Sequence, residues 1–179
     1  MWNLPNSLTV FRIGLVPILV VVLLTEIPDR EYWGLGIFLV ATFTDFFDGL
    51  IARRTGAVTV MGTLLDPIAD KLLICAAFIS LVELDLAPSW MVTVIVGREF
   101  AVTALRMIAL ERGLPIAANN LGKVKMVTQV VAVSILILGR KLGSWMILGH
   151  VSLWIALIFT VVSMVVYFWQ NRFVLSEGS

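Results

Sequence analysis

Six long apolar segments alternate with short polar connections along the chain. The connections contain residues that commonly end helices, such as Pro28, Gly56 and Gly113. A helix needs roughly 20 apolar residues to cross the hydrocarbon core of a bilayer, and each segment approaches that length. We therefore predict an all-α protein that forms a polytopic membrane bundle of six transmembrane helices. The predicted helices cover about Leu8–Thr25, Tyr32–Leu50, Gly62–Leu84, Ser89–Leu110, Leu121–Leu138 and Trp145–Gln170.

The composition agrees with a location in the membrane. Of the 179 residues, 60% are hydrophobic and only 14% are charged, and the mean hydropathy of +1.01 exceeds that of ordinary soluble domains. No polar stretch is long enough for a separate soluble domain, so we expect residues 1–179 to form a single domain. The net charge of +1 and the absence of a long basic run argue against nucleic acid as a partner.

The distribution of basic residues predicts the orientation of the bundle. With six spans, both termini lie on one side of the membrane, and basic residues concentrate there. That side carries Arg12, Arg53, Arg54, Arg112, Lys123, Lys125 and Arg172, whereas the opposite side carries Arg30, Arg140 and Lys141. Because cytoplasmic loops are enriched in Lys and Arg, we expect both termini in the cytoplasm. Trp33, Trp90 and Trp145 then begin helices at the outer interface, as in an aromatic belt.

Four aspartates lie within the predicted second and third helices. An acid in a spanning helix costs roughly 2.5 to 3.5 kcal/mol at the helix centre, so a cluster requires a compensating interaction. Asp45 and Asp48 are three residues apart, and Asp66 and Asp70 are four apart, so each pair shares a helix face. The short connection makes these helices antiparallel neighbours, which can direct both pairs into one cavity. Divalent cations would offset the repulsion, and hard oxygen ligands suit Mg²⁺ or Mn²⁺.

Buried salt bridges are the alternative interpretation of the same aspartates. The candidate basic partners are Arg53, Arg54, Lys71, Arg98 and Arg106.

The spacing of the aspartates belongs to a longer pattern. The chain reads Asp45-x2-Asp48-Gly49-x2-Ala52-Arg53-x8-Gly62-x3-Asp66-x3-Asp70. This pattern resembles the signature of the CDP-alcohol phosphatidyltransferase family, and all eight specified residues are present. The resemblance implies that Asp45, Asp48 and Asp66 bind two divalent cations, and that Asp70 acts as general base and also contacts a metal. It further implies transfer of a phosphatidyl group to an alcohol with release of CMP, and a homodimer.

The small residues of the pattern are consistent with a bulky nucleotide beside the helices. Gly49, Ala52 and Gly62 remove side chains where a cytidine diphosphate approaches the backbone, although close helix packing alone would also favour them. The Arg53 guanidinium suits phosphate oxygens. Together with Asp48, these residues form the predicted site for the nucleotide donor.

Other segments resemble bacterial phosphatidylglycerophosphate synthases, a branch of the same family. They are Asn3 to Arg12, Leu65 to Leu72, Gly97 to Phe100, and Leu121 to Lys125 with Gln129. The resemblance implies CDP-diacylglycerol as donor, sn-glycerol 3-phosphate as acceptor, and membrane lipids as surroundings. It also implies the inner membrane of a bacterium, with the active site on the cytoplasmic side. The chain has Met126 where the branch usually has Thr.

An anionic acceptor requires basic partners, and four residues are predicted to supply them. Arg98, Arg106, Lys123 and Lys125 are the candidates for binding the acceptor phosphate. Alternatively, Arg98 pairs with an aspartate of the cluster, and the two lysines are ordinary cytoplasmic charges. We expect Glu99, within the fourth helix, to orient an arginine.

The sequence can be compared with three alternatives to this function. The same chemistry with another acceptor, namely phosphatidylglycerol, inositol phosphate, inositol or serine, would make the chain a cardiolipin synthase or another family member. A divalent-cation transporter would also place acids in the membrane, but the chain shows no internal repeat and its acids crowd one interface. An inactive relative finds no support, because no position of the family pattern is altered.

Overall fold

The computed structural model describes residues 4–55, 60–114 and 120–172, and within these ranges the side chains of residues 4–6, 45–55, 60–67, 70, 120 and 144 lie outside the description. All regular elements of the described part are helices, and it contains no strand. Its elements are α1 (Leu4–Leu24), α2 (Arg30–Thr55), α3 (Val60–Glu83), α4 (Ser89–Glu111), α5 (Asn120–Ile137), α6 (Gly139–Leu142), the 3₁₀ turn η1 (Gly143–Trp145) and α7 (Met146–Gln170). The prediction of an all-α fold is thereby confirmed.

The six predicted long segments correspond to α1, α2, α3, α4, α5 and α7, with differences at a few ends. The helix α2 continues to Thr55, past the predicted end at Leu50, because Ala52, Arg53 and Arg54 are good helix formers even though the apolar run has ended. The four-residue α6 lies in a predicted connection. It ends where Gly143 adopts a φ of 54°, a left-handed conformation that glycine tolerates well.

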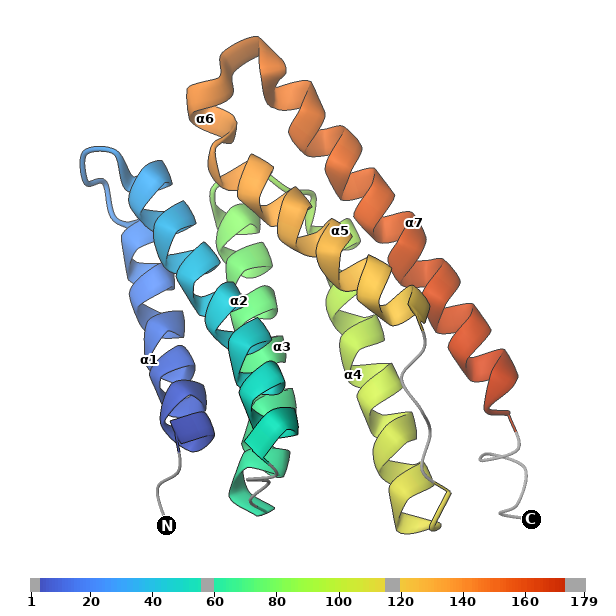
Figure 1. Cartoon of the computed structure of the whole chain (residues 1–179). Coiled ribbons are helices and arrows are strands. Elements are labelled where there is room, and N and C mark those ends of the chain that lie inside the picture. The colour runs from blue at the N-terminus through green and yellow to red at the C-terminus, as the bar shows by residue number, and fades with distance from the viewer. Residues whose placement is uncertain (1–3, 56–59, 115–119, 173–179) are drawn as a thin grey trace.

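The long helices form two packed groups that contact each other (Figure 1). The helices α1, α2 and α3 pack against one another, and α7 packs against α4 and α5. Contacts of α5 with α2 and α3, and of α4 with α3, join the two groups. The helices α4 and α7 run in the same direction (Figure 1). Their C-terminal ends therefore lie at the same end of the bundle.

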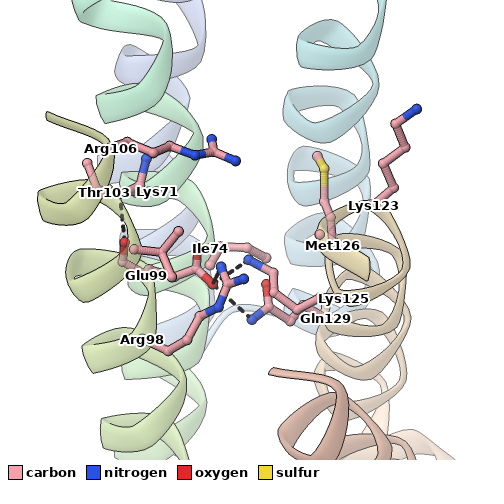
Figure 2. A pocket seen from close by; sticks show the side chains of 12 residues that line it. Lys71, Ile74, Arg98, Glu99, Thr103, Arg106, Lys123, Lys125, Met126 and Gln129 are labelled. Atoms are coloured by element: carbon pink, nitrogen blue, oxygen red, sulfur yellow. Dashed lines mark hydrogen bonds and ion pairs between the residues drawn. The ribbon is translucent and has the colours of Figure 1, made fainter. Parts of the chain in front are cut away.

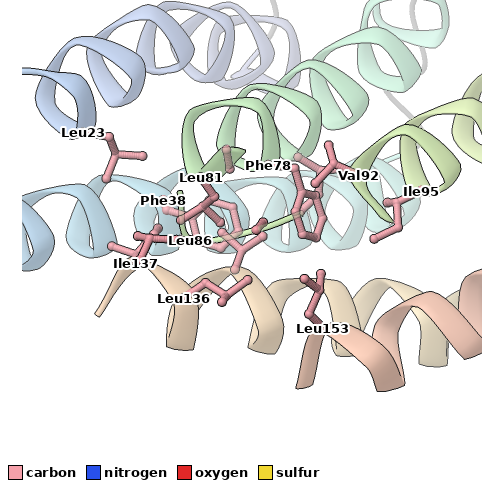
Figure 3. Close-up of a cluster of buried hydrophobic side chains, with 14 of the residues drawn as sticks. Leu23, Phe38, Phe78, Leu81, Leu86, Val92, Ile95, Leu136, Ile137 and Leu153 are labelled. Atoms are coloured by element: carbon pink, nitrogen blue, oxygen red, sulfur yellow. The ribbon is translucent and has the colours of Figure 1, made fainter. Parts of the chain in front are cut away.

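An apolar core fills the part of the bundle toward α6. Phe38 and Phe78 are fully buried there and meet Leu136 and Leu153, so α2, α3, α5 and α7 contribute to one cluster (Figure 3). A Cβ atom at Gly149 would lie 2.9 Å from the Leu136 Cδ2 atom, which shows how closely α5 and α7 approach. Several buried polar side chains lie outside this cluster, among them Arg12, Arg98 and Lys125.

Polar contacts also connect α6 to the two loops that contain Asp29 and Leu84. The Lys141 Nζ atom donates to the Asp29 carboxylate at 2.9 Å, and Arg140 donates to the Leu84 carbonyl at 3.3 Å. The hydrogen bond to Asp29 and its negative charge raise the pKa of Lys141. A raised lysine pKa means that this contact is present at neutral pH and is lost only as the pH rises above the ordinary lysine range.

Two described helices have the length and apolarity needed to cross a membrane, over Ser7–Leu24 and Met146–Gln170. Large apolar side chains such as Val21, Ile147 and Val165 are exposed on them. Exposed apolar surface of this extent suits contact with lipid rather than water. By length and composition these two helices favour a membrane protein, and the count of six spans remains a prediction.

Candidate active site

A cavity of about 230 Å³ opens between α3, α4 and α5 (Figure 2). Its lining contains five basic side chains and one acidic side chain, so it is strongly positive. The lining residues are Lys71, Ile74, Arg98, Glu99, Val102, Thr103, Arg106, Gly122, Lys123, Lys125, Met126 and Gln129. The structure therefore brings together all four residues predicted to bind the acceptor phosphate, together with Met126 at the position where the resembling branch has Thr.

Glu99 is the centre of a buried network on one wall of the cavity. One of its carboxylate oxygens, Oε1, accepts a hydrogen bond from the Lys125 Nζ atom, lies 3.5 Å from the Arg98 Nη1 atom, and lies 3.4 Å from the Gln129 Nε2 atom (Figure 2). Only 7% of Glu99 is exposed. Buried charges are tolerated when they are paired, and this network pairs both cations with one carboxylate. The expectation that Glu99 orients an arginine is confirmed.

The helix α7 supplies hydroxyl groups to the same network. The Arg98 Nη2 atom donates to the Ser163 Oγ atom at 2.9 Å, and the Gln129 Nε2 atom lies 3.3 Å from the Thr160 Oγ1 atom. Neither hydroxyl was predicted from the sequence. The spacing of Thr160, Ser163 and Tyr167 marks one face of a very apolar helix, but such hydroxyls commonly bond their own backbone, so the signal is weak.

Arg106 has a different environment from Arg98. Its Nε atom donates to the Tyr167 hydroxyl at 2.9 Å, and its Cζ atom lies 5.4 Å from the centre of the Tyr167 ring. The Arg106 side chain is exposed and extends from α4 toward the wall formed by α5 (Figure 2). Lys123 is exposed as well, whereas Arg98 and Lys125 are buried. The four predicted residues therefore separate into a buried pair held by Glu99 and an exposed pair.

The predicted metal-binding and donor-binding residues lie on α2 and α3. Their side chains are outside the described part of the chain: Asp45, Asp48, Gly49, Ala52, Arg53, Gly62, Asp66 and Asp70. Among the side chains that are described, no three of His, Cys, Asp or Glu form a group that could hold a metal ion. The backbone places α2 in contact with α3, and the aspartates occur toward the end of α2 and the start of α3. Asp70 precedes Ile74, a lining residue of the cavity, by one helical turn.

The sequence is similar to proteins of one enzyme family over nearly its full length. The family model described as CDP-alcohol phosphatidyltransferase matches residues 2–162. A relative from Bacillus subtilis (strain 168), named CDP-diacylglycerol–glycerol-3-phosphate 3-phosphatidyltransferase, is 45% identical over 96% of this chain and 96% of its own. A protein of the same name from Rickettsia felis is 39% identical over 93% of each chain. A cardiolipin synthase (CMP-forming) from Oryza sativa subsp. japonica is 38% identical over 77% of this chain but only 46% of its own length.

The family model covers far more than half of the chain, and the cavity contains the basic residues that the same resemblance predicted. The chain belongs to the CDP-alcohol phosphatidyltransferase family.

Proposed function

We propose that the chain transfers the phosphatidyl group of CDP-diacylglycerol to sn-glycerol 3-phosphate, which yields phosphatidylglycerophosphate and CMP. The observation that carries this proposal is the cavity lined by five cations and one acid. A phosphate monoester carries close to two negative charges at neutral pH and needs several basic partners. The relatives from Bacillus subtilis and Rickettsia felis bear the name of the same reaction.

In this proposal the acceptor phosphate contacts the exposed side chains of Arg106 and Lys123. The buried Arg98 and Lys125 contribute positive charge, and Glu99 keeps both in place. Because Glu99 neutralises part of that charge, the cavity remains cationic without leaving unpaired cations in the apolar interior. All four basic residues thus help to bind the acceptor phosphate. Arg106 and Lys123 contact it, and Arg98 and Lys125 attract it electrostatically.

Asp45, Asp48, Asp66 and Asp70 are proposed to hold two divalent cations, Mg²⁺ or Mn²⁺. The donor set fits this group, because it consists of hard carboxylate oxygens on two helices in contact. When bound, the cations would stabilise negative charge on the diphosphate and on the departing CMP. Asp70 is also proposed to receive the proton of the acceptor hydroxyl, and the fact that it precedes the lining residue Ile74 by one turn of α3 supports this role.

The nucleotide donor is proposed to lie along the end of α2. Gly49, Ala52 and Gly62 give room for the cytidine diphosphate, Asp48 shares in binding it, and Arg53 neutralises a phosphate oxygen. The acyl chains of the donor remain among membrane lipids. This arrangement requires the end of α2 and the start of α3 to lie close to the membrane surface, where a soluble acceptor can also arrive.

The proposed topology has six spans in a bacterial inner membrane, with both termini and the active site in the cytoplasm. Three exposed tryptophans support it: Trp33 and Trp90 lie in the first turns of α2 and α4, and Trp145 ends η1 directly before α7. A homodimer is an expectation that follows from the family resemblance.

A second acceptor is favoured by one comparison, the similarity to a cardiolipin synthase from Oryza sativa subsp. japonica. That reaction would use phosphatidylglycerol, whose phosphate is a diester with a single negative charge. The number of cations around the cavity suits a monoester better. Inositol phosphate shares the monoester, so an assay must compare the acceptors directly.

An acceptor panel tests the proposed function. Purified protein in detergent with CDP-diacylglycerol and Mg²⁺ is given sn-glycerol 3-phosphate, phosphatidylglycerol, inositol phosphate, inositol or serine, and both CMP and the lipid product are measured. We expect phosphatidylglycerophosphate from sn-glycerol 3-phosphate, loss of product with a chelator, and recovery with Mg²⁺ or Mn²⁺. Product with another acceptor alone would assign a different branch of the family. Metal binding without any release of CMP would favour the transporter.

A further inference from the structure

We propose that Tyr167 is a positioning residue that fixes the orientation of Arg106 and thereby strengthens binding of the phosphate group of the acceptor. The inference rests on the proposed function, because it concerns how the same cavity recognises sn-glycerol 3-phosphate. Tyr167 lies on α7, more than 60 residues beyond Arg106 in the sequence, and does not line the cavity itself.

The apolar packing of α4 against α7 fixes the position of the tyrosine hydroxyl. Tyr167 is only 3% exposed and belongs to a cluster with Val102, Leu105 and Ala109 of α4. Met164 and Phe168 of α7 pack against the same cluster. A ring held on several sides has few alternative rotamers, so its hydroxyl offers an acceptor at one defined point.

The Tyr167 hydroxyl accepts a hydrogen bond from one particular nitrogen of Arg106, the Nε atom. A guanidinium can bind an oxyanion with two parallel N–H groups, either along its Nε side or through its two terminal nitrogens. The hydrogen bond from Nε to the Tyr167 hydroxyl, at 2.9 Å, occupies the first of these. In the described part of the chain, no residue accepts a hydrogen bond from the Arg106 Nη atoms. Tyr167 therefore directs the two terminal nitrogens toward the ligand.

The ring of Tyr167 adds a second constraint on the same side chain. The Arg106 Cζ atom lies 5.4 Å from the ring centre, within the range of a cation–π interaction. Arg98 lies on nearly the same face of α4, two turns earlier, and repels Arg106 electrostatically. An exposed arginine without these contacts would sample many rotamers and would lose that freedom when the phosphate binds.

The parallel course of α4 and α7 gives each arginine its own partner. Ser163 accepts a hydrogen bond from Arg98, and Tyr167, one turn further along α7, accepts one from Arg106. The buried Arg98 also has Glu99 as a partner. Tyr167 is the corresponding partner of Arg106, which is the exposed one of these two arginines.

The variant Tyr167→Phe tests the inference, because it keeps the ring and removes only the hydroxyl. We expect the KM for sn-glycerol 3-phosphate to rise by about 3- to 10-fold, the typical effect of one hydrogen bond, while the KM for CDP-diacylglycerol stays within about 2-fold. The inhibition constant of inorganic phosphate, used as a competing anion, should rise by a similar factor. Tyr32→Phe is the matched control, since Tyr32 is the other tyrosine of the chain and lies on α2 near its first residue.

A double-mutant cycle separates positioning from a general structural role. Lysine has no counterpart of the Nε donor, so Tyr167→Phe should have little further effect on the KM when it is added to Arg106→Lys. A KM for sn-glycerol 3-phosphate that is unchanged in Tyr167→Phe would overturn the inference. Additive effects, or a fall in kcat and melting temperature without a change in KM, would overturn it too. If the wild-type protein itself does not use sn-glycerol 3-phosphate, the proposed function fails instead.

Discussion

Replacement of Asp70 by Asn is expected to lower kcat by about 10²- to 10⁴-fold, the usual range for loss of a general base. The amide has nearly the shape of the carboxylate, but it cannot accept the proton of the acceptor hydroxyl and it removes a negative charge from the proposed metal site. The release of CMP at saturating concentrations of both substrates measures this effect. The melting temperature of the variant in detergent should stay close to that of the wild type.

Asp85→Asn provides the control for Asp70→Asn. Asp85 is exposed just beyond the far end of α3 and has a φ of 57°, a conformation that Asn also tolerates. The control should retain the wild-type rate. Turnover that survives in Asp70→Asn would remove Asp70 from its role as base.

Replacement of Glu99 by Leu should have the largest effect on stability. The substitution leaves Lys125 and Arg98 buried without their shared carboxylate, and removal of one partner from a buried ion pair typically costs about 3 to 5 kcal/mol. We therefore expect a fall of this size in the free energy of unfolding, measured by denaturant titration in detergent. Catalysis should be lost as well, because Arg98 and Lys125 would no longer be held in place beside the cavity.

Two further variants make the Glu99 experiment decisive. Glu111→Leu removes an exposed acid from the last turn of the same helix and should change the stability by less than about 0.5 kcal/mol. Combining Glu99→Leu with Lys125→Met should restore part of the lost stability, because one of the two buried cations that contacted Glu99 is then absent. Wild-type stability in Glu99→Leu would show that the network does not hold this part of the bundle together.

The long helices could be predicted because their apolar runs are almost as long as the helices themselves. Where the apolar run and the helix end at different points, as after Leu50, hydrophobicity alone misplaced the boundary. The short α6 could not be predicted from Gly139, Arg140 and Lys141, since those residues are equally typical of a polar connection.

The basic residues of the cavity could be predicted from local segments that resemble the family, but their division into two pairs could not. That division depends on which cation reaches Glu99, and the contact joins α4 to α5. Tyr167 was missed for a similar reason. An aromatic residue in an apolar helix is usually a packing residue, and only its contact with Arg106 indicates another role.

We propose above that carboxylates of α2 and α3 hold divalent cations beside a cavity that binds the acceptor phosphate. A crystal structure of the protein with Mn²⁺ and sn-glycerol 3-phosphate, with anomalous scattering recorded for manganese, would locate both groups. We expect manganese peaks among the oxygens of Asp45, Asp48, Asp66 and Asp70, and phosphate density against Arg106 and Lys123. Manganese bound elsewhere, with those aspartates paired only to arginines or turned toward lipid, would disprove the proposed site.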